Sequence, residues 1–122
     1  IGFLKAKVQA GADYVVSQMF YDNRAFYRFT EECTKAELGV PIIPGIKIIN
    51  SLHQLTSIPR NFFVSIPDTL VDEIQANPKH VKEIGVRWAT EQARDLLNHG
   101  VKCLRFYIMN DAQSVTKVID SL

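Results

Sequence analysis

The sequence predicts an α/β fold built around a parallel sheet. Three apolar, β-prone segments, at 13–20, 40–46 and 102–110, are separated from one another by helix-like sequence. Such alternation is typical of right-handed βαβ units. With 122 residues, the chain is long enough for one domain and one core, and no second domain is expected.

Composition excludes several classes of protein. The chain is 47% hydrophobic and 22% charged with a net charge of +1, as in an ordinary soluble globular protein. Its Lys and Arg residues are scattered, whereas a nucleic-acid surface needs them clustered. No apolar run reaches the eighteen or so residues of a membrane span, and no secretory signal pattern opens the chain.

The cysteines and histidines give no metal-binding pattern. Cys33 and Cys103 are far apart and lack ligand spacing, which predicts two reduced thiols in a cytosolic protein. His53, His80 and His99 fall in helices or at helix ends, where we expect them at the surface. We therefore predict no metal site.

The first third of the chain reads as helix, strand, helix. Residues 2–10 have the pattern of the end of an amphipathic helix, with Gly11 suited to a left-handed C-cap. The run DYVVSQMF at 13–20 has the composition of a strand. Asp22 or Asn23 can cap the next helix, which Gly39 closes.

The remainder repeats this order with a longer helical insertion. VPIIPGI at 40–46 resembles a buried parallel strand with proline at its ends. A short helix follows, capped by Asn50 or Ser51 and stopped by Pro59. Further helices are predicted from Pro67, and from Asn77-Pro78 to Gly100, before the last strand at 102–110 and a helix at 112–122.

Three strands make a poor sheet on their own, because at least one edge and both faces would be undercovered. A closed eight-stranded barrel of strand–helix pairs usually needs about 250 residues. The first residues, IGFLK, lack an initiator Met and read as a helix already under way. We therefore expect the C-terminal portion, about the last three strand–helix units, of a TIM-type (β/α)8 barrel.

Ligand chemistry in parallel α/β folds collects at the carboxyl ends of the strands. The first such end contains Gln18, inside an apolar run. A buried amide there would cost free energy without partners, and an amide offers both the donor and the acceptor that a heteroaromatic edge requires. The structural alternative is that Gln18 bonds to a neighbouring loop backbone.

For the other polar or aromatic residues near the strand ends, a structural role is the simpler interpretation. Gln54, on the short helix after the second strand, reads as a solvated side chain. Asp22 reads as a helix cap, and Trp88 as packing. No carboxylate pair, Ser/His/Asp order or glycine-rich phosphate loop is present in the sequence. We assign no catalytic residue to this segment.

Three segments nevertheless resemble a known family in order and spacing. AGADYVVSQMFYD, VPIIPGI and LRFYIMN are similar to AGA-x(5)-TQ-[FL]-F-[FY]-D, IIPGI and HFYTLN in the C-terminal part of the methylenetetrahydrofolate reductase family. The resemblance covers essentially all 122 residues. It implies an FAD-carrying barrel in which NAD(P)H reduces the flavin, which then passes hydride to 5,10-methylenetetrahydrofolate, giving 5-methyltetrahydrofolate.

The resemblance also implies site residues. Gln18 falls on the glutamine that binds the pterin edge, and Gln54 on a second folate contact. Lys7 falls on a basic helix residue at the phosphate side of the flavin cofactor. Two positions depart from the family: Asp111 replaces an arginine that would serve folate's anionic tail, and Ile58 replaces an aromatic residue beside the folate.

The family's catalytic glutamate and most cofactor ligands belong to earlier strands, so this segment alone is expected to be inactive and poorly stable. The resemblance implies a cytoplasmic enzyme of methionine supply, expected to form a homo-oligomer. Two other hypotheses stay open. A non-catalytic α/β binding or assembly module would keep Gln18 and Gln54 but bind no flavin; an aldolase-like barrel would need a Schiff-base lysine, for which Lys47 is the candidate.

Overall fold

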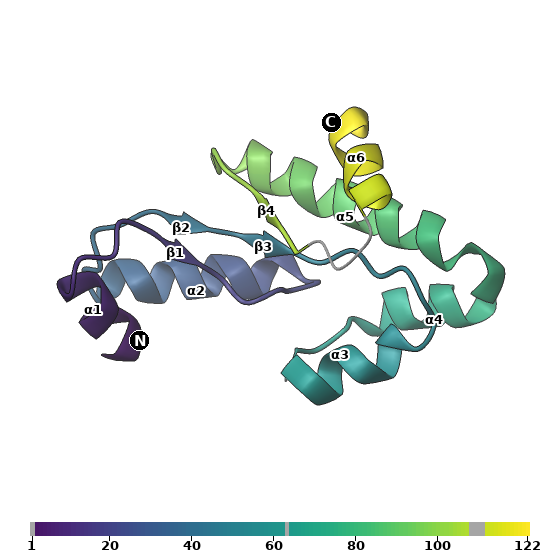
Figure 1. The fold of residues 1–122 in the computed structure, drawn as a ribbon, viewed down its shortest axis with the longest axis horizontal. Helices are drawn as coiled ribbons and strands as arrows, with labels where there is room; N and C mark the ends of the chain where they lie inside the picture. The colour runs from purple at the N-terminus through teal and green to yellow at the C-terminus, as the bar shows by residue number, and fades with distance from the viewer. Residues whose placement is uncertain (1, 63, 108–111) are drawn as a thin grey trace.

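The chain folds into short parallel strands flanked by six α-helices in the part that the structure describes (Figure 1). The structure is a computed structural model that describes residues 2–62, 64–107 and 112–122, with side chains from residue 6 onward. The elements, in chain order, are α1 (Gly2–Gln9), β1 (Val15–Val16), α2 (Asn23–Lys35), β2 (Ile42–Ile43), β3 (Gly45–Ile46), α3 (Gln54–Phe62), α4 (Asp68–Ala76), the 3-10 helix η1 (Pro78–His80), α5 (Val81–Asn98), β4 (Arg105–Phe106) and α6 (Ala112–Ser121).

The strands pair in parallel, as the sequence predicts. β1 pairs with β2, and β3 pairs with β4. β2 and β3 are adjacent in the chain and are divided by Pro44, which has no N–H to donate to a ladder. The segment 42–46 therefore lies between β1 on one side and β4 on the other, so the spatial order of the strands follows their order in the chain.

The regular strands are much shorter than the predicted segments. Each has two residues, whereas the sequence pattern predicts seven to nine. The predicted second strand is broken at Pro44, and in the first, the N–H of Gly45 bonds to the Ser17 side chain, Oγ at 3.0 Å, where a ladder would use the main chain. The end of the third predicted strand, 108–110, lies outside the described residues.

One hydrophobic core lies between the strands and the helices α2, α5 and α6. Ile46 is fully buried in it and shares it with Phe26 of α2, Leu96 of α5 and Val118 of α6. Phe106 of β4 packs against the same core. Since side chains alternate across a strand, Gly45 and Arg105 point toward the opposite face, which these helices do not cover.

A second core lies beyond the carboxyl ends of the strands, where α3 and α4 are placed (Figure 1). Met19 and Tyr21, directly after β1, pack there with Ile58 of α3, Leu70 of α4 and other apolar residues. The helices α3 and α4, which lie between β3 and α5 in the chain, thus pack in a core of their own and form one wall beyond the carboxyl ends of the strands.

Gly85 lets α5 approach the segment that follows β3. An added Cβ at Gly85 would lie 1.8 Å from the carbonyl oxygen of Ile49 and 3.3 Å from the Ile48 side chain. Only a residue without a side chain fits this contact. Gly85 therefore fixes the course of the segment that leads to Gln54.

Several helix boundaries correct the sequence prediction. The third helix was predicted to run from Asn50 or Ser51 to Ile58, but α3 begins at Gln54 and continues through Pro59 to Phe62. Proline removes one N–H and does not stop a helix whose apolar face is held by packing; Ile58 is 3% exposed. α2 ends at Lys35, before Gly39, and Glu37 adopts a left-handed conformation, φ 55°.

Other predictions are confirmed. Asp22 caps α2, with its carboxylate accepting a hydrogen bond of 2.9 Å from the Arg24 N–H. Trp88 is a packing residue that donates its Nε1–H to the Tyr21 carbonyl at 2.9 Å. Gly11 has a positive φ of 110°. The three histidines are exposed, Cys33 is buried and Cys103 is exposed, and both thiols are free.

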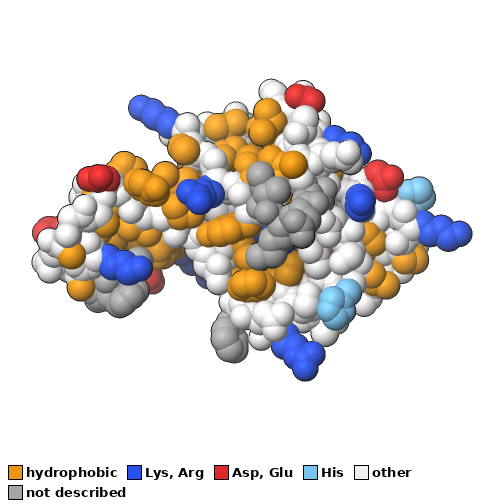
Figure 2. All heavy atoms as spheres, viewed as in Figure 1, with side chains coloured by type: hydrophobic (Ala, Val, Ile, Leu, Met, Phe, Trp, Pro, Cys, Tyr) orange, Lys and Arg blue, Asp and Glu red, His pale blue; other side chains and the backbone are white. Residues whose placement is uncertain are grey.

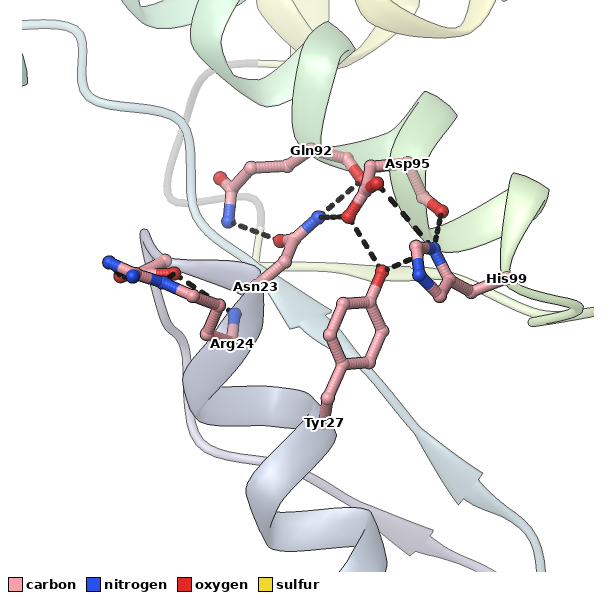
Figure 3. Close-up of polar contacts among 7 residues, drawn as sticks. Asn23, Arg24, Tyr27, Gln92, Asp95 and His99 are labelled. Carbon is pink, nitrogen blue, oxygen red and sulfur yellow. Dashed lines mark hydrogen bonds and ion pairs between the residues drawn. The ribbon is translucent and has the colours of Figure 1, made fainter.

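A polar cluster joins the start of α2 to the second half of α5 (Figure 3). Asn23 donates to Asp95 Oδ2 at 2.9 Å, and the Tyr27 hydroxyl donates to the same oxygen at 2.6 Å. His99 stacks on Tyr27 with ring centroids 4.5 Å apart. Gln92 donates to Asn23 Oδ1 and to the Phe20 carbonyl. These bonds hold α2 against α5 and thereby position the chain between β1 and α2.

The cluster makes stability depend on pH. Hydrogen bonds from Asn23 and Tyr27 hold the pKa of Asp95 below its ordinary value. A carboxylate with a lowered folded-state pKa stabilises the fold above the unfolded pKa, near 4, and this stabilisation is lost as the pH falls through the folded pKa. Because the Asp95 side chain is 47% exposed, the contribution is about 1 kcal/mol or less.

We expect Asp95→Asn to lower the thermal midpoint of the complete polypeptide at pH 7, because an amide accepts these bonds more weakly. The difference from wild type should shrink as the pH falls below about 4, because the wild-type carboxylate is then protonated. Circular dichroism melts across this range measure it, with exposed Asp72 of α4 replaced by Asn as the control. A difference that stays constant with pH would contradict the role assigned to the Asp95 charge.

Within the described ranges, no helix is long and apolar enough to cross a membrane. Among the same residues, no group of three or more His, Cys, Asp or Glu side chains is arranged to hold a metal ion.

Candidate functional site

The strand ends bring Ser17, Gly45 and Tyr107 together. The Tyr107 hydroxyl donates to the Ser17 carbonyl at 2.9 Å, so its side chain crosses from the third strand segment to the first. It passes over Gly45, where an added Cβ would lie 2.5 Å from the Tyr107 ring. Tyr107 therefore lies on the face that α2 and α5 leave uncovered, and its ring is held in a fixed position there.

This open face has a defined order of side chains. Val16 pairs with Ile43, and Gly45 pairs with Arg105. On the other side of Gly45 stands Ser17, whose Oγ accepts the Gly45 N–H at 3.0 Å, so Gln18 follows directly after the residue that contacts Gly45. The Ser17 N–H still donates to the Ile43 carbonyl at 2.9 Å, so the pairing reaches the residue before Gln18.

Gln18 is exposed, which corrects the expectation of a buried amide. Its Oε1 accepts the N–H of Met19 at 3.2 Å, a bond within its own loop. The burial cost of an amide therefore does not apply to Gln18, although Ser17 and Met19 on either side of it are buried. Only Oε1 takes part in the bond to Met19, so the NH₂ group is the part of the amide left to donate to a ligand.

Gln54 is partly buried and has a structural task. Its Oε1 accepts the N–H of Asn50 at 2.6 Å and the N–H of Ser51 at 3.2 Å. It therefore closes the loop before α3 and is not the freely solvated side chain that the sequence pattern favours. Since one oxygen serves both backbone bonds, its Nε2 donors are the part of the amide left for a ligand.

Lys7 is exposed on α1, and α1 lies at the end of the sheet where β1 and β2 begin (Figure 1). Gln18 and Gln54 both follow the carboxyl ends of strands, so they belong to the other end. Both glutamines thus follow strands at the carboxyl end of the sheet, whereas Lys7 belongs to the helix at the opposite end.

Lys47 follows β3 directly and is 4% exposed. Its Nζ lies 3.5 Å from the Ile48 carbonyl oxygen. Around it are Tyr21, whose pKa is raised by burial, and Trp88 and Gln92 of α5. An amine enclosed in this way is not open to a carbonyl substrate, which argues against the aldolase-like alternative.

A cleft of about 330 Å³ opens beside the first strand end. It is lined by residues of the 21–24 turn, by Pro67 and Thr69 before and in α4, and by Trp88, Glu91 and Gln92 of α5. Its charges are partly compensated, because Arg24 pairs with Asp22 at 2.8 Å. That ion pair lowers the pKa of Asp22.

Of the two positions that depart from the family pattern, the structure describes one. Ile58 is buried among Met19, Tyr21 and other apolar side chains, so it supports the wall formed by α3 rather than presenting a surface to a ligand. Asp111 lies outside the described residues. Tyr107 is the site residue that sequence reasoning passed over, although it stands at the third predicted strand end.

Comparison with known proteins agrees with the sequence resemblance. The sequence profile of the family described as "Methylenetetrahydrofolate reductase" matches residues 1–122. "Methylenetetrahydrofolate reductase (NADH) 1" of Arabidopsis thaliana is 33% identical over 125 residues, covering all of this chain and 21% of that protein. "Methylenetetrahydrofolate reductase 1" of Schizosaccharomyces pombe is 36% identical, with the same coverage of each chain.

A bacterial relative is shorter. "5,10-methylenetetrahydrofolate reductase" of Escherichia coli is 32% identical over 113 residues, which cover 90% of this chain and 38% of that protein. The chain therefore spans about a fifth to two-fifths of the length of these relatives. The match over all 122 residues shows that the chain belongs to the methylenetetrahydrofolate reductase family.

Proposed function

We propose that this chain forms the last part of the catalytic barrel of an enzyme that reduces 5,10-methylenetetrahydrofolate to 5-methyltetrahydrofolate with NAD(P)H. The observation that supports the proposal is that Gln18 and Gln54 both follow the carboxyl ends of parallel strands, β1 and β3. Family membership supplies the chemistry, and this placement supplies the site.

In this proposal, Gln18 and Gln54 bind and orient the folate. The exposed Gln18 amide presents donors and an acceptor to the pterin edge, and Gln54 presents Nε2 while its Oε1 holds the loop. Tyr107 forms a fixed surface beside the strand end that carries Gln18, because its hydroxyl is bonded to the Ser17 carbonyl. α3 and α4 form the wall that limits water access from one side.

FAD, when bound, would carry hydride between the nicotinamide and the folate. The exposed ammonium of Lys7 fits a phosphate group of this cofactor, and its position at the other end of the sheet separates it from the folate site. The family's remaining cofactor ligands belong to strands that precede this segment. Relatives carry both nucleotides in their names, NADH in Arabidopsis thaliana and NADPH in Caenorhabditis elegans, so the proposal names NAD(P)H.

The proposed fold is the final three strand–helix units of a (β/α)8 barrel. The parallel pairing and the order β1, β2–β3, β4 support this, since neighbours in a barrel follow chain order. Exposed apolar side chains such as Tyr14 and Leu52 remain at the surface, and Figure 2 shows hydrophobic side chains on the side viewed in Figure 1. Such exposure suits contact with the rest of a larger protein, here proposed to be a cytoplasmic homo-oligomer.

The test is the purified complete polypeptide that contains this segment. We expect a flavin absorbance spectrum and NAD(P)H-dependent reduction of methylenetetrahydrofolate. The alternative, a non-catalytic α/β module, predicts colourless protein that consumes no NAD(P)H. Folded protein without flavin, even when supplied with FAD, would reject the proposal and favour that module.

A further inference from the structure

Arg105 is an exposed cation on the open sheet face. It pairs in register with Gly45, while its neighbour Phe106 packs against the core on the helix-covered side. Tyr107, two residues further along, lies over Gly45 on the open face, and residues two apart in a strand share a face. Arg105 therefore points to the same side of the sheet as Tyr107.

Arg105 pairs with Gly45 on one side, and the carbonyl oxygen of Ser17, the residue before Gln18, lies on the other side, 2.8 Å from where a Cβ of Gly45 would be. The Tyr107 ring lies over Gly45, between these two positions. Neighbouring parallel strands lie about 4.8 Å apart, so the two flanking backbones are roughly 10 Å apart. A ligand that lies over the Tyr107 ring and contacts Gln18 is therefore within reach of the long Arg105 side chain.

The strand segments of this chain offer Arg105 no counter-charge. The strand segments 14–18, 41–47 and 102–107 contain no Asp or Glu. Among the residues that the structure describes, the Arg105 side chain has no hydrogen bond or ion pair. A guanidinium presents five donors and no acceptor, and it matches anionic oxygens with a planar, bidentate geometry.

We propose that Arg105 is a second ligand-binding residue of the Gln18 site, which recognises an anionic oxygen of the bound ligand. This inference rests on the proposed function. Two groups in that reaction have the required chemistry, namely the carboxylates of folate and the anionic ring edge of the reduced flavin. The family pattern HFYTLN has histidine where this chain has Arg105, so the permanent charge is a property of this sequence.

The experiment compares Arg105→Gln, Arg105→His and Arg105→Lys in the complete polypeptide, with Arg28→Gln on α2 as a matched surface control. Three quantities are measured: the Kd of a folate, the Kd of the matching pteroate, which lacks the glutamate carboxylates, and the midpoint potential of bound FAD. Thermal unfolding is recorded for every variant.

Loss of the charge in Arg105→Gln should have one of two effects. Folate binding at least tenfold weaker, with pteroate binding unchanged, identifies the carboxylate as the ligand group. A lower flavin potential, equal to a tenfold change in relative affinity or about 30 mV for two electrons, identifies the reduced flavin. In either case Arg105→Lys keeps the positive charge and should therefore retain part of the wild-type affinity or potential. Arg28→Gln should match wild type.

Two results would overturn the inference. In the first, Arg105→Gln leaves both Kd values and the potential unchanged. In the second, it only lowers the unfolding temperature, which would show that Arg105 pairs with a carboxylate of the protein itself. If the wild-type polypeptide binds flavin and folate and the Arg105 variants leave both Kd values and the potential unchanged, only the role of Arg105 is rejected. If the wild-type polypeptide binds neither flavin nor folate, the proposed function is rejected as well.

Discussion

Replacing Gly85 by alanine is expected to be among the most destabilising single changes in this chain. The new methyl group would lie 1.8 Å from the Ile49 carbonyl oxygen, so the main chain has to move. Overpacking of this kind costs roughly 1–3 kcal/mol, and the upper end applies because the obstacle is backbone rather than a flexible side chain. The gain of about 1 kcal/mol from alanine's helix propensity does not offset it.

The same substitution should also weaken folate binding, because Ile49 leads directly into the loop that Gln54 closes. Urea and thermal unfolding of the complete polypeptide measure the stability term, and the Kd for folate measures the second. Glu91→Ala, at an exposed position of the same helix, is the control and should change stability by about 0.5 kcal/mol or less. If Gly85→Ala has wild-type stability, then α5 does not make this close contact with the segment after β3.

Replacing Gln18 by alanine is expected to give the largest loss of activity. If the amide forms two hydrogen bonds with the pterin edge, each contributing about 0.5–1.5 kcal/mol, folate kcat/KM should fall roughly 10- to 100-fold. Flavin content should stay nearly unchanged, because in this account Gln18 serves the folate and not the retention of the cofactor. Since Gln18 is exposed, its loss creates no buried cavity, and the thermal midpoint should hardly change.

Steady-state kinetics with varied folate, together with flavin absorbance per polypeptide, separate the two roles. Gln75→Ala is a matched control, because Gln75 is an exposed glutamine on α4 to which no contact with a ligand is assigned. Loss of flavin accompanied by normal folate kinetics would contradict the assignment of Gln18 to the substrate.

The class of fold and the order of elements can be predicted from this sequence because they depend on local pattern. Three such patterns are the apolar β-prone runs, the helix cap at Asp22 and the helical periodicity from Val81 to Leu96. Each depends only on residues that are close together in the sequence. The periodic face is buried as expected, with Ile84 and Leu96 in the two cores. Parallel pairing follows from the helical connections, which leave the strands no other short way to pair.

Features set by tertiary contacts were not predictable in the same way. The requirement for glycine at position 85 comes from Ile49, which is distant in the sequence. The break at Pro44 divides a strand that reads as continuous. The sequence pattern predicts a helix stop at Pro59, yet α3 continues because packing of its apolar face outweighs the loss of one backbone hydrogen bond.

The candidate site, too, can be predicted from the sequence only in part. Gln18 and Gln54 stand out in the sequence through their place after strands, but their partners do not. The bond from Tyr107 to Ser17 and the capping of Asn50 by Gln54 depend on side-chain direction, which periodicity does not report. Arg105 is not singled out by the sequence pattern, because its proposed role depends on its pairing with Gly45, next to the strand end that carries Gln18.

The central claim is that the strand ends of this chain bind a pteridine through side-chain amides. A crystal structure of the complete polypeptide with a folate bound tests it most directly. We predict the pterin edge within hydrogen-bonding distance of the Gln18 amide, on the sheet face occupied by Tyr107. A folate seated elsewhere, with Gln18 still bonded only to the Met19 N–H, would contradict the account.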